Sequence, residues 1–398
     1  MNVYESLGVQ TIINASGPVT RLGGADMSET VLAAFHEAAH SWVPLEQLQA
    51  AASRMIARVT GAEAGLVTGG AAASLTLGAA AIMAGYDSAR MEQLPNTESF
   101  PNEFVIAREQ RSGYDHAVRA AGAKLVEVGF NEVVAGAGVR RTEVWEYEAA
   151  FTPRTAGVLY VYTSASQPAL AAVVEAAHRH NLPVLVDAAG ELPPRSNLML
   201  AGTTRADLVA YSGGKAIRGP QSTGLLCGKS DLIASAALQS LDMDDHWELW
   251  EPPAEFIDRR KLNGMPRHGI GRSMKVSKEE IVAFVTALEI FASQDSTDER
   301  DTQRQHLQLI AEAVEGPAVH CELIDSNGDE RVPLLEITVA AADAFVICRE
   351  LRKGTPPIYV GHGKLAEGKL VIHPMCLSRD AADTIARRLR KELEPGGN

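Results

Sequence analysis

The chain has 398 residues, of which 46% are hydrophobic, and its 37 lysines and arginines against 50 acidic residues give a net charge of −13. This composition is typical of a globular protein long enough for two or three structural units, and it excludes an intrinsically disordered chain. The acidic balance, without a basic cluster, argues against a nucleic-acid surface. The four cysteines are widely spaced and indicate neither a disulfide framework nor a thiolate metal site, which favours a reducing cytoplasm.

The N-terminal region shows no secretory signal, because MNVYESLGVQTIINASG lacks a basic stretch followed by an apolar run. Further on, His36, Glu37 and His40 match HExxH, in which two histidines one helical turn apart bind zinc and the glutamate activates water. Glu63 is a candidate third ligand. Too few residues precede the motif to build the sheet that presents a substrate, so we favour an amphipathic helix with surface or interface histidines and expect no metal.

The segment Thr68-Gly69-Gly70-Ala71-Ala72-Ala73-Ser74 follows an apolar pair and leads into a helical pattern. Free amides at a helix N-terminus bind phosphate, and glycines allow its close approach. The spacing lacks GxGxxG, so it does not predict a dinucleotide site, and a turn that merely caps a buried helix is the alternative. The uncharged stretch 65–85 has the length of a membrane helix, but its alanines and glycines are typical of a helix buried in a soluble domain.

From Glu103 to Cys227, short apolar runs alternate with helical patterns, which is typical of a mostly parallel sheet covered by helices. We predict strands at 104–107, 124–128, 157–162, 183–187, 207–211 and 223–227, with a helix from Pro168 between the third and the fourth. An acidic stretch at 241–265 interrupts the pattern. It is a candidate lid, and a disordered excursion or an oligomer contact are the alternatives.

Asp187 ends the fourth predicted strand, and such a carboxylate faces the crevice where ligands bind in open α/β folds. Paired with a pyridine nitrogen, it would keep that nitrogen protonated, whereas the alternative role is a helix N-cap. Lys215 follows the next strand within Ser212-Gly-Gly-Lys-Ala-Ile-Arg-Gly-Pro, where two glycines allow a tight turn and the approach of a flat ligand. A Walker loop is excluded because Ala216 replaces its Ser or Thr. Alone, Lys215 would be an ordinary lysine in a glycine-rich turn.

After Arg272, the amphipathic pattern KEEIVAFVTALEIFASQ predicts the first helix of a smaller C-terminal domain. That domain is expected to contain strands at 334–339 and 370–373 and helices at 342–351 and 379–392. We therefore predict three parts: an N-terminal segment 1–45 that packs on the large domain or on a partner, a large cofactor-binding domain 46–265, and a small domain 266–398.

The order and spacing of three features resemble the fold-type-I pyridoxal-phosphate enzymes. A candidate phosphate-binding turn comes first, an acid at a strand end follows, and a lysine comes after the next strand. More narrowly, SGGKAIRGPQSTGLL, VDAAGELPP and GIGRSMKVSKEEI resemble the selenocysteine-synthase-like family, which includes ammonia lyases. The resemblance covers nearly the whole chain. It implies pyridoxal 5'-phosphate as cofactor and an aspartate-aminotransferase-like α/β fold, with a mixed, mostly parallel sheet in the large domain and a smaller C-terminal α/β domain.

The resemblance also implies roles for individual residues. Lys215 would carry the cofactor as a Schiff base, and Asp187 would pair with the pyridine nitrogen. The remaining cofactor contacts would come from Thr68, Gly69, Gly70 and Ser212 at the phosphate and from Gln110, in the Arg108-Glu109-Gln110 segment, at the ring. The implied substrate pocket contains Asn14, Thr20, Arg218, Gln221, Arg272 and His362, and Lys275 is a further candidate for binding an anion. Where a substrate-binding arginine would be expected after Pro356-Pro-Ile-Tyr-Val, the chain reads Gly361-His362-Gly363-Lys364, so His362 or Lys364 would substitute.

The implied activity is that of a pyridoxal-phosphate-dependent lyase, which acts on a small amino acid or amino-sugar acid by α-proton abstraction and β-elimination with release of ammonia. An amino-acid racemase or aminotransferase is the alternative within the family, and a zinc hydrolase using His36-Glu37-x-x-His40 is the alternative of another class. The presence of both Lys215 and Asp187 disfavours a binding protein that has the fold without the chemistry. We expect a cytoplasmic homodimer or higher homo-oligomer with its active site near the interface, and no nucleic-acid or membrane partner.

Overall fold

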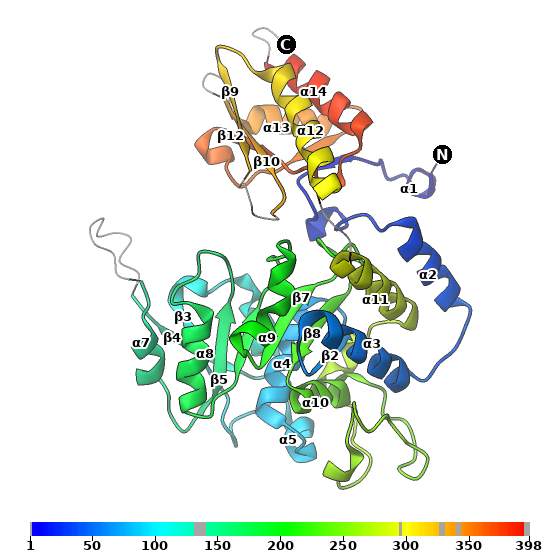
Figure 1. Ribbon diagram of the computed structural model, residues 1–398, viewed down its shortest axis with the longest axis vertical. Coiled ribbons are helices and arrows are strands. Elements are labelled where there is room, and N and C mark those ends of the chain that lie inside the picture. The colour runs from blue at the N-terminus through cyan, green and yellow to red at the C-terminus, as the bar shows by residue number, and fades with distance from the viewer. Residues whose placement is uncertain (1, 131–140, 294–296, 326–330, 340–343, 394–398) are drawn as a thin grey trace. The chain divides into compact units, whose positions relative to one another are not determined.

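The computed structural model describes residues 2–130, 141–293, 297–325, 331–339 and 344–393. Contacts divide the chain into two compact units, which Figure 1 shows in the colours of their sequence positions. The large unit is the continuous stretch Met27–Ala292. The C-terminal unit combines Met1–Asp26 with Ser293–Asn398, so it is built from both ends of the chain. No helix in the described ranges combines the length and the apolar character needed to cross a membrane.

The large unit is organised around a seven-stranded sheet with the strand order β2-β8-β7-β6-β5-β3-β4. All neighbours pair in parallel except β8, which is antiparallel to both β2 and β7. The mixed, mostly parallel sheet is therefore confirmed, and each of the six predicted strands is present. The strands are β2 (Ala64–Thr68), β3 (Glu103–Ala107), β4 (Lys124–Val128), β5 (Thr155–Val161), β6 (Val184–Asp187), β7 (Leu208–Ser212) and β8 (Gly224–Gly228).

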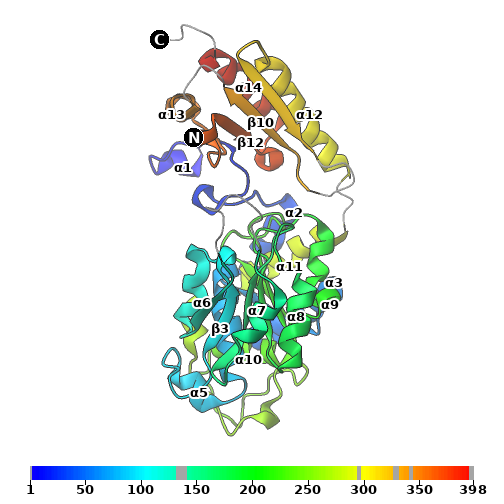
Figure 2. The same cartoon turned by 90° about the vertical axis from the view of Figure 1, so that its left-hand side faces the viewer.

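Helices cover both faces of this sheet, as the edge-on view in Figure 2 shows. Successive strand residues point to opposite faces, so that along β6 Leu185 enters one apolar layer, whereas Val184 and Val186 enter the other. Burial on both faces explains why the strands are apolar almost throughout. The first layer contains α4 (Ala71–Ala84), α5 (Ser88–Gln93), α6 (His116–Ala120) and α10 (Ser230–Ser240), and the second contains α3 (Leu45–Thr60), α7 (Val144–Ala149), α8 (Leu170–Arg179), α9 (Leu200–Thr204) and α11 (Lys278–Ser293).

The boundaries between the units differ from the predicted domain limits. Helix α11 buries Ile281, Phe284 and Leu288 in the second apolar layer, so the division falls between Ala292 and Ser293 instead of at 265–266. The first 26 residues group with the C-terminal unit and not with residues 27–45, because β1 (Ile13–Ala15) pairs in parallel with β11 (Ile358–Val360).

The excursion at 241–265 is anchored to the first apolar layer of the large unit. Trp250, Phe256 and Ile257 are buried in that layer. The guanidinium carbon of Arg259 lies 4.1 Å from the ring centroid of Trp247, and its nitrogens donate to the carbonyl oxygens of Trp247 and Trp250 at 2.6 Å. The alternative of a disordered excursion is therefore wrong, because this segment is packed against the large unit.

The C-terminal unit has its own core around a three-stranded antiparallel sheet, ordered β12-β10-β9. Its strands are β9 (Val319–Ile324), β10 (Leu334–Val339) and β12 (Lys369–Ile372), and its main helices are α12 (Thr297–Val314), α13 (Ala344–Lys353) and α14 (Arg379–Leu393). The predicted strands and helices of this region are present, although residues 342 and 343 of the predicted helix 342–351 lie outside the described residues. Helix α12 was not predicted.

Candidate active site

The carboxyl ends of the parallel strands meet at one edge of the large-unit sheet. Thr68 ends β2 and Ser212 ends β7, and both pair with Gly224 of the intervening strand β8. Two strand spacings separate them, which is about 10 Å. Asp187 ends β6, where it pairs with Ala210 of β7. Three residues predicted for the cofactor site therefore share the edge at which ligands bind in open α/β folds.

Gly69 and Gly70 form the turn from β2 into α4, and both need to be glycine. Gly70 has φ +109°, in the left-handed region, and a Cβ on Gly69 would stand 2.8 Å from the carbonyl oxygen of Met274. The amide of Ser74 is the first in α4 to find an intrahelical acceptor, the Gly70 carbonyl oxygen at 3.0 Å. Within the described ranges the preceding amides of Ala71–Ala73 have no acceptor, and the 14-residue helix adds its positive end, so this turn has the features of a phosphate-binding turn.

Lys215 lies in a compact turn directly after β7. The amide of Gly213 donates to the Thr223 carbonyl oxygen at 2.9 Å, and the amide of Gly219 donates back to the Gly213 carbonyl oxygen at 2.9 Å. A side chain on Gly213 would meet the buried ring of Phe284 at 2.8 Å. The tight turn expected from the glycines is therefore present, and Phe284 of α11 packs against it.

Arg218 and Gln221 belong to this same folded segment. The amide of Arg218 donates to the Lys215 carbonyl oxygen at 3.0 Å, and Arg218 itself has a left-handed φ of 59°. The backbone of Gln221 occupies the space that a side chain on Gly214 would need. Both of these predicted substrate residues are partly exposed, and both belong to the folded segment that contains Lys215.

The amine of Lys215 reaches the turn that follows Asp187. Its Nζ lies 3.6 Å from the position that a Cβ on Gly190 would take. Burial raises the pKa of Asp187, and the charge of Asp115 adds to this, whereas the Ala189 amide, which donates to Oδ1 at 3.0 Å, and the positive charge of Lys215 lower it. The next helix begins only at Arg195, so Asp187 is not the helix cap considered from sequence.

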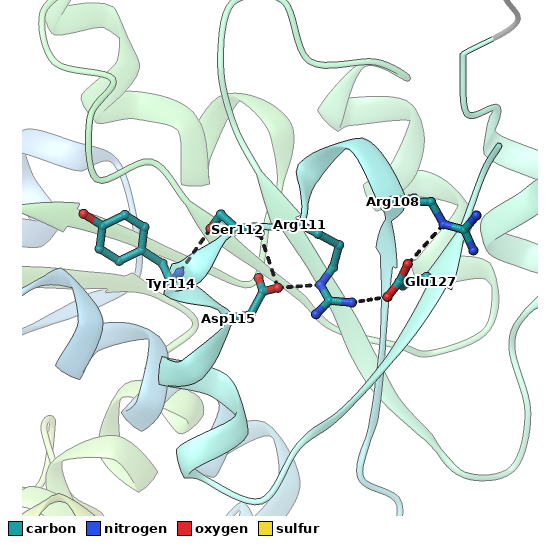
Figure 3. Close-up of polar contacts among 6 residues, drawn as sticks. All are labelled: Arg108, Arg111, Ser112, Tyr114, Asp115 and Glu127. Carbon is teal, nitrogen blue, oxygen red and sulfur yellow. Dashed lines mark hydrogen bonds and ion pairs between the residues drawn. The ribbon is translucent and has the colours of Figure 1, made fainter. Parts of the chain in front are cut away.

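Ion pairs hold the turn that follows β3, as Figure 3 shows. Nε of Arg108, in the 3-10 helix η2 (Arg108–Gln110), lies 3.1 Å from a carboxylate oxygen of Glu127 on β4. Arg111 bonds to the same carboxylate and to the buried Asp115, and the Asp115 contact raises the pKa of Arg111. Both arginines that flank Glu109 and Gln110 are thus bound to acidic partners.

Gln110 points from this turn toward the neighbouring strand. Its Oε1 accepts a hydrogen bond from the amide of Val161, the last residue of β5, at 2.9 Å. Val161 pairs with Asp187, so Gln110 lies at the same sheet edge. Its buried Nε2 has no hydrogen-bond partner in the described parts of the chain, and the nearby Tyr160 hydroxyl donates instead to the Pro168 carbonyl oxygen at 2.8 Å. A contact between Gln110 and the cofactor ring stays a prediction.

A cavity of about 400 Å³ lies beside Thr68 within the large unit, and Arg272 and Lys275 line it. Arg272, predicted to bind an anionic ligand, has an internal partner: its Nη2 lies 2.6 Å from a carboxylate oxygen of Asp242. The pKa of Asp242 is lowered to about 2, first by the amide of Asp244 and then by His268 and Arg272. Lys275 is therefore the stronger candidate for binding an anion in this cavity.

The HExxH residues do not form a metal site with Glu63. His36 and His40, at the end of α2 (Glu29–Ala39), have ring centroids 4.9 Å apart, but the Glu63 carboxylate accepts from the amide and hydroxyl of Ser230 at 3.0 and 3.1 Å. In the described ranges, a different group has ligand atoms close enough to share an ion, namely Asp242, Asp244 and His268. The zinc alternative is therefore not supported.

The other predicted substrate residues lie in the C-terminal unit. Asn14 is on β1, Thr20 begins the 3-10 helix η1 (Thr20–Leu22), and His362 follows β11. Arg21, which the sequence reasoning did not single out, has its Nη2 3.2 Å from Nδ1 of His362. Lys364, the other candidate in that turn, is bonded to Glu336. The sequence around Arg21 does not predict this contact, because the contact depends on the pairing of β1 with β11, which are separated by almost the whole chain.

Two curated relatives match the chain over nearly its full length, although no family model matches it. It is 31% identical over 401 residues to a 5'-C-glycyluridine monooxygenase-decarboxylase from Streptomyces sp, covering 98% of this chain and 92% of the relative. It is 29% identical over 411 residues to a D-glucosaminate-6-phosphate ammonia lyase from Salmonella typhimurium strain 14028s, covering 99% and 98%. An L-seryl-tRNA(Sec) selenium transferase from Solidesulfovibrio magneticus is 29% identical over 257 residues, covering 56% of this chain and 49% of the relative.

Solved structures agree with these sequence matches. A structure of D-glucosaminate-6-phosphate ammonia-lyase superposes with a TM-score of 0.80 at 27% identity, and both chains are covered completely. A mutant aspartate aminotransferase from Thermus thermophilus has a TM-score of 0.50 at 16% identity, with 99% of each chain covered, and it shows the fold alone. The predicted aspartate-aminotransferase-like fold is thereby confirmed.

Proposed function

Because this chain belongs to the selenocysteine-synthase-like family of fold-type-I pyridoxal-phosphate enzymes, we propose that it is a pyridoxal-phosphate-dependent lyase of small amino acids or amino-sugar acids. The proposed reaction removes the α proton and a β substituent and releases ammonia. The full-length likeness to an ammonia lyase, in both sequence and structure, supports the lyase class. The observation that carries the proposal is that the Lys215 amine lies beside the turn that follows Asp187. This turn is at the sheet edge where β2 ends in Thr68.

The residues present fit pyridoxal phosphate. The start of α4 offers unpaired amides and a close approach to a phosphate at Gly69 and Gly70, with Thr68 and Ser212 at the flanking strand ends. Asp187 offers a carboxylate to the pyridine nitrogen, and Lys215 offers the amine that would hold the cofactor covalently. When bound, the cofactor supplies an electron sink for the charge left on a substrate carbon after proton removal.

The chain's own residues then have separate tasks. A buried carboxyl with a raised pKa, such as Asp187, readily shares a proton with a ring nitrogen that it contacts. The Lys215 amine, which would hold the cofactor, would also take up the α proton of the substrate and return a proton to the departing β substituent. The compact turn of Gly213–Gly219 holds that amine at a fixed place, which favours directed proton transfer.

Product analysis tests this proposal directly. Purified protein with cofactor is incubated with serine-like amino acids and with amino-sugar acids, and ammonia and 2-oxo acid are measured. We expect both products in equal amounts from at least one substrate. If neither ammonia nor a 2-oxo acid is released while the α hydrogen exchanges with solvent, the protein is a racemase instead of a lyase. If the amino form of the cofactor accumulates, it is an aminotransferase.

The likeness to a monooxygenase-decarboxylase favours a second candidate reaction, in which a carboxyl group is lost and oxygen is consumed. The same lysine and aspartate would serve it, because loss of either a proton or a carboxyl group leaves charge on the same carbon. An oxygen electrode and a carbon dioxide assay separate the two. Oxygen uptake with carbon dioxide release, and without ammonia, would assign the chain to this second reaction.

We further propose that the protein is a homo-oligomer. Trp42 is 86% exposed and Val43 48% exposed in the connection between α2 and α3, and Leu32 on α2 is 40% exposed. Large apolar side chains gathered in one segment support burial against another copy of the chain. Light scattering should report a multiple of the 42.5 kDa chain mass. A single chain mass at micromolar concentration would contradict this expectation.

A cytoplasmic location is also proposed. All four cysteines are free thiols, two of them buried at Cys227 and Cys348, and a chain without disulfides suits a reducing compartment. Fractionation of the native host should place the protein with other cytoplasmic enzymes.

A further inference from the structure

Four alternating charges form a row beside the turn that follows β3, as Figure 3 shows. Arg108 and Arg111 both bond to Glu127 of β4, and Arg111 also bonds to Asp115. The exposed fraction of these side chains falls along the row, from 49% at Arg108 through 35% at Glu127 and 30% at Arg111 to 6% at Asp115. We name these four residues the Asp115 row. Its outer end is positive and exposed, and its inner end is negative and buried.

Burial decides which charge of the Asp115 row acts at a distance. The four charges sum to zero, but water screens an exposed charge strongly and a buried charge weakly. Arg108 therefore contributes little at the inner end of the row, where Arg111 offsets only part of the charge of Asp115. The row presents a net negative potential at the end where Asp115 lies.

The segment that contains Asp115 is bonded to two elements of the candidate site. Asp115 ends the 3-10 helix η3 (Gly113–Asp115) and directly precedes α6. The hydroxyl of Thr76, in the second turn of α4, donates to a backbone carbonyl oxygen of α6 at 2.8 Å. In the turn before η3, Gln110 bonds to the last residue of β5, which pairs with Asp187. Asp115 is thus held between the helix with the free N-terminal amides and the strand next to Asp187.

The surroundings of Asp115 leave its charge only partly neutralised. Both bonds that it accepts, from Nε of Arg111 and from the Ser112 amide at 3.3 Å, fall on Oδ2, and among the described residues none donates to Oδ1. Its charged neighbours are Arg111 and, through Arg111, Glu127 of β4. His116, the next residue, is exposed, and α4 contains no titratable side chain.

The charge of Asp115 reaches Asp187. Burial is the main cause of the raised pKa of Asp187, and two charged side chains act on it in opposite directions: Lys215 lowers its pKa, and Asp115 raises it. A negative charge favours a proton on any nearby base, so it acts in the same sense on a base that shares a proton with Asp187.

We propose that Asp115 is a positioning residue for the bound cofactor, whose negative charge acts together with Asp187 to keep the ring nitrogen protonated. This inference rests on the proposed function, because it concerns the ring nitrogen that Asp187 would contact. A firmly held proton strengthens the electron sink. Arg111 sets the strength of the effect, since it fixes the carboxylate in place and neutralises part of its charge.

A pH titration of the visible absorbance of the purified holoenzyme tests this inference. Asp115→Asn removes the charge and nearly keeps the size, so we expect the pH midpoint at which the bound cofactor loses its proton to fall by about 0.5 to 1. Arg111→Gln removes the positive partner and should raise the midpoint by at least about 0.3. Asp115→Glu keeps the charge and should stay within about 0.2 of the wild-type midpoint. Two variants that merely loosened the same turn would not shift the midpoint in opposite directions.

Asp207→Asn is the matched control, because Asp207 is a buried carboxylate of the large unit that pairs with Lys229 and bonds to the amide at the start of β6. Thermal unfolding should show a loss of stability in both Asn variants, since each breaks an ion pair of a buried carboxylate, but only Asp115→Asn should shift the midpoint. If Asp115→Asn does not fold, the direction of the Arg111→Gln shift decides.

Three results would overturn the role of Asp115: an unchanged midpoint in Asp115→Asn, a lowered midpoint in Arg111→Gln, or an equal shift in Asp207→Asn. Each of them leaves the proposed function intact, provided that borohydride reduction of the wild-type protein fixes a pyridoxyl mass on Lys215. A wild-type protein with neither the visible absorbance nor that label would contradict the proposed function itself, and the role of Asp115 with it.

Discussion

Replacing Lys215 by alanine should abolish covalent attachment of the cofactor and lower turnover by at least about 10³-fold, because the variant loses both the covalent anchor and the amine that moves the proton. The side chain extends from a turn whose backbone bonds involve Gly213, Thr223 and Gly219 and not the lysine amine, so the fold should persist. Mass mapping after borohydride reduction and steady-state turnover measure the two effects, and thermal unfolding verifies the fold.

Lys261→Ala is a suitable control for this variant. Lys261 is a surface lysine of the large unit whose Nζ lies 2.7 Å from Asp231, and its removal should change neither labelling nor turnover. If the Lys215→Ala variant still carried a pyridoxyl label on another lysine at wild-type yield, the assignment of Lys215 would be wrong.

Asp187→Asn should lower turnover by about 10²- to 10⁴-fold while the cofactor remains attached to Lys215. The amide is nearly isosteric and still accepts the Ala189 hydrogen bond, but it cannot carry the negative charge that holds a proton on the ring nitrogen. Turnover and the visible spectrum of the bound cofactor should both change. Asp187→Glu, which keeps the charge, should recover part of the loss.

Asp207 offers a matched comparison at the opposite end of the same strands. It is buried, accepts from the Val184 amide at 2.7 Å where β6 begins, and contacts His178 at 2.9 Å. Asp207→Asn should lower thermal stability and leave the cofactor spectrum unaltered, because this carboxylate ties strands together and is remote from the carboxyl edge. Equal spectral changes in both variants would remove the special role given to Asp187.

The large-unit sheet was largely predictable because its signals are local. Each strand is a short apolar run, and Asp187 and Lys215 follow such runs directly, so their place at the carboxyl edge needs only the rule for parallel strands. The direction of β8 was not predictable, because an apolar run has the same pattern in either orientation. Helix α12, with the polar sequence TDERDTQRQHLQLIAEAV, was missed because few apolar residues mark its buried face.

Charge partners were the least predictable part of the candidate site. Arg272 was expected to bind an anionic ligand, but Asp242, some 30 positions earlier, neutralises it. Arg21 was overlooked because its neighbours Tyr359 and His362 reach it only through the pairing of β1 with β11. Both cases depend on long-range contacts, to which residue type and spacing give no access.

The pairing of β1 with β11 also orders events during synthesis on the ribosome. The residues of the large unit are continuous in sequence, so this unit can fold as soon as Ala292 has emerged. Residues 1–26 emerge before the large unit, yet β1 must wait until Ile358–Val360 has been made before it has a strand to join. A nascent chain that stops after the large unit would therefore carry an unpaired β1, and removing that strand would damage a unit whose other part is made only after the large unit.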